Sequence, residues 1–264
     1  MTDEPRKPNS LDISEILREW TFEPGQINVR KIYSDEGREM IQLRLDLGLL
    51  QMEMTGRPDG QRPEGYDSLL DYYEHELDLH RRRHGTDEGF ELDERACELL
   101  RSEGVMYYHR YLALFVLEDY PAVVRDTLRN MRLFDFCHQY AEEESDRFIL
   151  EQYRPYVLMM CSRARSHLAL QDNRPKAALA AVRNGIDKVR RFYDQYESDL
   201  AEHSTELAIL QAMSRDIERS LPVDPIKKLR ADLLDAVENE RYEEAAALRD
   251  RLDHLTGDDD SYNY

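Results

Sequence analysis

Apolar residues recur at helical spacing over a long region of this chain, and nothing else in the sequence constrains its fold as strongly. Every signal between Tyr66 and Tyr196 is helical, and short polar breaks divide the region. We expect helices at about 66–84, 91–117, 120–140, 145–171, 174–197 and 203–220. The pattern predicts a mainly α fold. Residues 66–220 would form a helical-repeat-like bundle whose neighbouring helices share one core.

Two of the breaks have the same form: a helix, a tight acidic turn, and a helix opened by a proline. They are Glu118-Asp119-Tyr120-Pro121 and Asp172-Asn173-Arg174-Pro175. After the second, Ala178 and Gly185 are seven residues apart, where the tetratricopeptide repeat places small residues for close helix packing. The body therefore resembles degenerate tetratricopeptide repeats, although the first copy has Val123 and Asn130 at these positions. An unrelated helical bundle is the alternative.

The N-terminal part has a different period. We expect residues 1–24 to be a flexible N-terminus with one short helix, which Ser10 can cap and which Trp20 and Phe22 would anchor. Residues 27–33 are typical of a strand, and residues 41–49 alternate apolar and polar side chains, as in a half-buried strand.

Near Gly48 the apolar phase shifts to Leu50, Met52 and Met54, as a β-bulge would cause. We therefore predict a small N-terminal β-hairpin within residues 25–65, with one long, bent strand, that packs on the helices. A helix over residues 39–54 is the alternative.

The end of this segment, residues 55–65, is a loop by composition. It holds glycines and two arginines, but it lacks the Gly-Lys-Ser/Thr ending of a P-loop, so a rigid surface turn is the simpler interpretation. One alternative function is an enzyme or small-ligand binder with its site between loop 55–65 and the helical body. Such a site would join Arg57 or Arg62 with His75, His80 or Glu76 in a deep pocket.

Composition limits the partners. The chain has 55 acidic and 36 basic residues, a formal net charge of −19. Nucleic-acid binding needs concentrated Lys and Arg, so we expect no direct contact with nucleic acid. No stretch approaches the roughly 20 apolar residues that span a bilayer, and the N-terminus has no secretory signal. An odd number of unpaired cysteines favours reduced, buried thiols, and we expect a cytoplasmic protein.

The sequence shows no catalytic signature. His75 and His80 nearly complete the zinc-protease pattern, but they are five residues apart instead of four, which separates the rings by about 140° around a helix. Nucleophile-elbow and dinucleotide-binding patterns are missing. We therefore expect no catalytic residue, metal site or cofactor, and no enzyme activity.

Residues 223–256 predict a helical hairpin. Asp224 can cap its first helix and Pro225 fits the first turn. Apolar residues continue at helical spacing on both sides of the polar turn Glu238-Asn239-Glu240-Arg241. A chain below about 40 residues rarely folds unaided, so the hairpin needs another surface. Residues 257–264 are expected to be a disordered acidic tail.

The second helix of this hairpin begins Tyr242-Glu243-Glu244-Ala245-Ala246-Ala247-Leu248-Arg249-Asp250. Together with Ile226, Leu229 and Leu233, it closely resembles the UVR motif of the excision-repair proteins UvrB and UvrC. The motif also occurs in Clp-type ATPases and in an activator of a bacterial protein-arginine kinase. The resemblance covers about 223–256 and implies a hairpin that pairs with another hairpin. The nuclease, helicase, ATPase and zinc signatures of those proteins are missing, so only an interaction module is implied.

The resemblance implies a protein-binding site at Leu229, Leu233, Tyr242, Glu243, Ala245, Ala246, Arg249 and Asp250. Tyrosine is enriched at binding hot spots. Arg249 lies two turns beyond Tyr242 on the same face and can bind a carboxylate across an interface. The two alanines are small enough for helices to approach closely.

These patterns predict a non-enzymatic adaptor or regulatory protein of a bacterial cytoplasm. Its partner would be another UVR-type hairpin: in a second copy of the chain, in a Clp-type ATPase or in an excision-repair protein. An excision-repair-associated role is a second alternative. The hairpin could instead dock on its own helical body through Leu207, Leu210, Met213 and Ile217.

Overall fold

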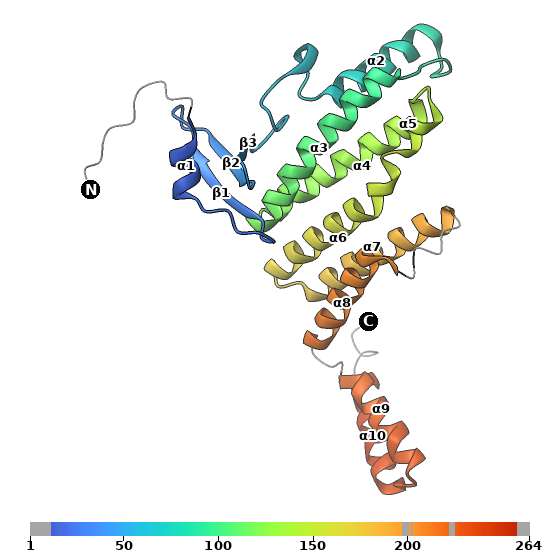
Figure 1. Ribbon diagram of the computed structural model, residues 1–264. Coiled ribbons are helices and arrows are strands. Elements are labelled where there is room, and N and C mark those ends of the chain that lie inside the picture. Colours follow the sequence, from blue (N-terminus) through green and yellow to red (C-terminus); the bar gives the residue numbers. More distant parts are fainter. Residues whose placement is uncertain (1–11, 197–200, 202, 222–224, 258–264) are drawn as a thin grey trace, which may run out of the picture. The chain divides into compact units, whose positions relative to one another are not determined.

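The computed structural model describes residues 12–196, 201, 203–221 and 225–257. The chain divides into two compact units, Met1–Arg215 and Asp216–Tyr264. The predicted class is confirmed: the chain is mainly helical, with a small N-terminal β element and a C-terminal helical hairpin (Figure 1). The predicted caps Ser10 and Asp224 and the tail beyond Gly257 lie outside the described residues.

The first unit begins with helix α1 (Ser14–Glu19) and a three-stranded antiparallel sheet. Its strands are β1 (Asn28–Tyr33), β2 (Glu39–Arg44) and β3 (Leu49–Glu53), in that order. As predicted, the β element packs on a helix, because β1 and β2 lie against α3 (Figure 1). On one face Arg30 donates to Gln42 and Gln42 to Gln51, at 2.8 and 2.9 Å. The Arg30 guanidinium also lies 4.2 Å from the centre of the Trp20 ring.

The prediction of one bent strand after residue 40 is wrong, because the chain reverses at residues 45–48. The backbone N–H of Leu45 donates to the carbonyl of Gly48 at 2.9 Å, which closes a tight turn. Ile41 on β2 then pairs with Met52 on β3. Directly paired residues share a face of the sheet, so the shift of apolar phase marks a strand reversal and not a β-bulge.

The following helices are α2 (Leu69–His84), α3 (Glu94–Val116), α4 (Tyr120–Tyr140), α5 (Glu144–Phe148), α6 (Arg154–Gln171), α7 (Pro175–Gln195) and α8 (Thr205–Ser220). The side chains of Ser68, Asp93 and Asp119 cap α2, α3 and α4 by accepting a backbone N–H three residues on. The single helix predicted at 145–171 is broken into α5, a 3-10 turn (Glu151–Tyr153) and α6. Pro155 has no N–H and crowds the preceding turn, so the helix must restart there.

Helices α3, α4, α6 and α7 pack side by side in chain order (Figure 1). The predicted burial of Cys97, Cys137 and Cys161 is confirmed. One crossing is so close that only glycine fits: a Cβ at Gly185 would lie 2.3 Å from Ser162 Oγ and 2.6 Å from Ser162 Cβ. The small residue that the sequence indicated therefore serves the contact between α6 and α7.

Residues 54–68, here called the strap, connect β3 to α2 and include the 3-10 turn Pro63–Gly65. Arg110 of α3 holds the strap. Its Nε and Nη2 donate to both carboxylate oxygens of Asp126 on α4, at 2.7 and 2.9 Å. Its Nη1 donates to the carbonyls of Glu53 and Gly56, at 3.1 and 2.8 Å. One buried ion pair thus joins α3, α4, β3 and the strap.

Three helix pairs turn with the same backbone geometry. The left-handed residue is Glu118 between α3 and α4, Asn173 between α6 and α7, and Glu240 between α9 (Pro225–Glu238) and α10 (Tyr242–Gly257). In each turn the next residue donates its N–H to the carbonyl five residues back, at 2.8 to 3.0 Å. This bond satisfies a carbonyl that the helix end leaves free.

The residues four before and five after each left-handed residue are buried: Leu114 and Val123, Ala169 and Ala178, and Ala236 and Ala245. The two acidic turns predicted from the sequence therefore follow one repeated design, and the C-terminal hairpin contains a third copy. The likeness to tetratricopeptide repeats stays a prediction.

Gly185→Ala should destabilise the first unit by about 1–3 kcal/mol, because its methyl group would overlap Ser162. Urea unfolding followed by circular dichroism measures the change. Gly48→Ala is the control, since no atom lies within 4 Å of its Cβ position. Adding Ser162→Gly should restore much of the loss; equal stability of Gly185→Ala and the natural chain would contradict the close crossing.

Glu240→Gly should stabilise the α9–α10 turn, because a non-glycine residue in the left-handed region costs roughly 1 kcal/mol. Amide hydrogen exchange on the full chain should slow in α9 and α10 by about 2- to 5-fold. Glu238→Gly, at the last position of α9, should instead speed exchange. Faster exchange in Glu240→Gly than in the natural chain would contradict the prediction that glycine stabilises this turn.

Candidate protein-binding site

The predicted binding residues lie on the α9–α10 hairpin of the second unit. The two helices run antiparallel, and residues 239–241 join them (Figure 1). Arg241 braces the turn: it forms ion pairs with Asp235 before the turn and, at 2.7 Å, with Glu244 after it. Asn239 Nδ2 donates to the carbonyl of Asp235 at 2.8 Å. The polar turn of the sequence thus ties the end of α9 to the start of α10.

The inner face of the hairpin is small and apolar. Ala236, Ala245 and Leu252 are buried. Leu229 and Leu233 of the predicted site are half-buried, and they share a face with Ala236 by their spacing on α9. Ala245, also predicted to contact a partner, lies where α9 and α10 approach each other. Its small size therefore serves the hairpin itself.

The remaining predicted residues, Glu243, Ala246, Arg249 and Asp250, are exposed, and Tyr242 is 68% exposed. Tyr242, Ala246 and Arg249 lie at helical spacing on one face of α10. On α9, Leu234 is 62% and Val237 is 49% exposed.

These five exposed residues share one side of the hairpin. In antiparallel helices, residues rotated in the same sense from the inner face point to the same side. Leu234 and Val237 are so rotated on α9, as Tyr242, Ala246 and Arg249 are on α10. We call this side the open face. Leu234 was not among the predicted binding residues, although its spacing from Val237 was readable in the sequence.

The open face combines apolar side chains with one cation. Arg249 forms an ion pair only with its neighbour Asp250, at 3.2 Å, among the described residues. Its guanidinium can therefore reorient towards a carboxylate on a partner. Exposed Leu, Val and Tyr side chains beside an exposed arginine suit contact with another amphipathic helix.

The predicted docking residues of the body lie on α8. Leu207, Leu210 and Ile217 are buried, and Met213 is half-buried. A Cβ at Gly185 would lie 3.3 Å from Leu210 Cδ1, so Leu210 packs on α7. Docking of the hairpin on the body stays a prediction.

The residues predicted for the rival ligand site do not converge. The Nε of Arg57 lies 3.2 Å from Asp59 and 3.6 Å from Glu103, and Arg62 pairs with Asp67 at 2.9 Å. The ring of His80 instead lies against His84, with centroids 4.5 Å apart and the ring planes tilted by 38°. A pocket does lie beside the strap, but other arginines line it. The arginines of α4 among them recur at helical spacing in the sequence. A basic helix face of this kind resembles an ordinary solvated face.

No group of three or more His, Cys, Asp or Glu side chains among the described residues could hold a metal ion. No helix in the described ranges is long and apolar enough to cross a bilayer.

Comparison with known proteins bears on the hairpin. Residues 224–255 match the UvrB/uvrC motif, which confirms the resemblance predicted for residues 223–256. No curated protein and no solved structure matches the chain. The chain therefore carries a UvrB/uvrC motif, and that motif forms the α9–α10 hairpin.

Proposed function

We propose that this chain is a non-enzymatic adaptor or regulatory protein that contacts a partner protein through the open face of its C-terminal hairpin. The UvrB/uvrC motif at residues 224–255 carries the proposal, because such motifs mediate protein interactions. The exposure of Leu234, Val237 and Tyr242 supports it. Burying exposed apolar area of this kind stabilises an interface by roughly 25 cal/mol per Å².

The proposed partner is another UVR-type hairpin. It belongs to a second copy of this chain, a Clp-type ATPase or an excision-repair protein. A symmetric pair of identical hairpins would place each Tyr242 against apolar residues of the other copy. An excision-repair-associated role is compatible with the same motif, and it would act through protein contact, since a net charge of −19 opposes direct binding to DNA.

Tyr242→Ala in the full chain should weaken this association by about 2 kcal/mol, roughly 30-fold in Kd, because it removes the largest exposed side chain of the open face. Light scattering during size-exclusion chromatography measures self-association. Biolayer interferometry measures binding to purified Clp-type and excision-repair proteins.

The control is Tyr33→Ala on β1, an equally exposed tyrosine in the first unit. It should leave association unchanged. Leu234→Glu tests the α9 side of the open face and should weaken binding as Tyr242→Ala does. If the natural chain neither self-associates nor binds any of these proteins, or if both hairpin variants bind as well as the natural chain, the proposal fails.

A further inference from the structure

A pocket of about 460 Å³ lies within the first unit, between Gly56 of the strap and helices α3 and α4. Four arginines line it: Arg110 from α3, and Arg125, Arg129 and Arg132 from α4. The last three recur at positions i, i+4 and i+7, so they project from one face of α4. Four guanidinium groups around one pocket are unusual in a chain with a net charge of −19.

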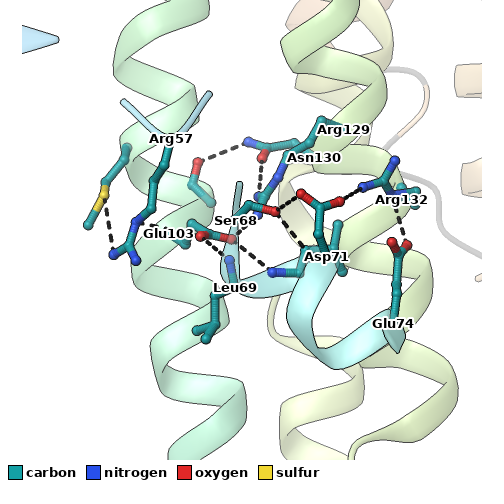
Figure 2. Close-up of polar contacts among 12 residues, drawn as sticks. Arg57, Ser68, Leu69, Asp71, Glu74, Glu103, Arg129, Asn130 and Arg132 are labelled. Atoms are coloured by element: carbon teal, nitrogen blue, oxygen red, sulfur yellow. Dashed lines mark hydrogen bonds and ion pairs between the residues drawn. The ribbon is translucent and has the colours of Figure 1, made fainter. Parts of the chain in front are cut away.

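Three carboxylates also line the pocket, and each is already engaged; Asp67 pairs with Arg62 at 2.9 Å. Asp126 is 1% exposed, and its two oxygens accept hydrogen bonds from Arg110 and Arg125, at 2.7 to 2.9 Å. Asp71 accepts from Arg132 at 2.7 Å and from Ser68 Oγ at 2.6 Å (Figure 2). These acids fix Arg110, Arg125 and Arg132 in place, and they leave one guanidinium nitrogen of Arg125 and one of Arg132 without a partner among the described residues.

Arg129 is the least compensated of the four. It is 9% exposed, and Glu103, its one carboxylate partner among the described residues, is shared: Glu103 also accepts from the backbone N–H of Leu69 at 2.7 Å and of Leu70 at 3.3 Å (Figure 2). The Nε of Arg129 has no hydrogen-bond partner in the described part of the chain. Burial lowers the pKa of Arg129 to about 9, so the guanidinium is still charged at neutral pH.

Arg125 and Arg132, which line the pocket, have further donors. Arg125 uses Nε and Nη2, towards Asp126 and the Met54 carbonyl, and Arg132 uses Nε and Nη2, towards Glu74 and Asp71. Within the described residues, Nη1 of each arginine has no acceptor. Both side chains are open to solvent, at 42% and 51% exposure.

The Tyr107 ring also lines the pocket and lies close to two guanidinium groups. Its ring centre lies 4.1 Å from the Arg129 guanidinium and 4.8 Å from that of Arg110. Stacking on an aromatic face holds a guanidinium in a fixed plane, which suits binding of planar or tetrahedral oxyanions. The geometry is therefore organised before any ligand arrives.

We propose that this pocket binds a small polyanion that carries phosphate groups. Arginine presents parallel N–H donors that match phosphate oxygens, and the free nitrogens of Arg125 and Arg132 provide them at two places. These residues are seven apart, about 10 Å along α4, so a ligand with two anionic groups bridges them better than a single phosphate. The volume lies in the range of about 300–1,000 Å³ typical of small-molecule sites.

Isothermal titration of the full chain with inorganic pyrophosphate, at constant ionic strength, tests the site. Saturable binding at one site per chain is expected. Arg125→Gln and Arg132→Gln should each weaken it at least about 10-fold, since each removes a charge-assisted donor. Arg165→Gln, at an exposed position of α6, changes net charge equally and should leave the affinity unchanged.

Leu128→Glu provides a variant that removes no hydrogen bond. Leu128 lines the pocket and is 42% exposed, so a carboxylate there should repel the ligand without disturbing the core. Thermal unfolding of each variant checks that it folds. No saturable binding, equal weakening by Arg165→Gln, or tighter binding of citrate than of pyrophosphate would overturn the proposal.

Discussion

The buried pair of Arg110 and Asp126 is the contact on which most of the first unit depends. The Arg110 guanidinium joins α3 to α4 and binds the end of β3 and the start of the strap, which lie 54 to 57 positions earlier in the sequence. A buried ion pair adds little net stability when it replaces apolar packing, but loss of one partner leaves a charge in the interior and costs about 3–5 kcal/mol. Without Arg110, the carbonyls of Glu53 and Gly56 would also lose their donor. The pair therefore determines where the strap lies, and with it the shape of the arginine-lined pocket.

The two units share one type of turn between paired helices. Each of the turns α3–α4, α6–α7 and α9–α10 has one residue in the left-handed conformation, and the next residue donates the same backbone hydrogen bond. In the body, successive helix pairs stack and bury both sides, as α4 does against α3 and α6. The hairpin buries one side around Ala236 and Ala245 and keeps an open face around Tyr242. The same helix–turn–helix arrangement thus packs against its neighbours in the body and presents a candidate contact surface in the hairpin.

The predictions from sequence were strongest where a single helix determines the outcome. Spacing alone placed Tyr242 and Arg249 on one face of α10, and the turn at residues 239–241 was evident from its polar residues. The prediction from sequence failed at residues 45–48, because a β-bulge and a tight turn produce the same shift of apolar phase along the sequence. It also treated Ala245 and Ala246 alike, although one is buried and the other exposed, because that difference depends on the neighbouring helix. The arginines of α4 escaped notice for a similar reason: a basic face with i, i+4 spacing normally faces water.

The sequence by itself determined the helical class, the boundaries of five of the six predicted body helices to within a few residues, the need for glycine or a small residue at Gly185, and the UvrB/uvrC motif. These follow from local periodicity, capping and turn chemistry, which act over a few residues. Only the tertiary structure decided that β3 is a separate strand, that the strap is held by Arg110, and that Arg125, Arg129 and Arg132 surround a pocket with Tyr107. Those outcomes depend on pairings between residues up to 71 positions apart, such as Arg125 with the Met54 carbonyl. Local periodicity cannot determine such pairings, because they follow from how whole elements pack.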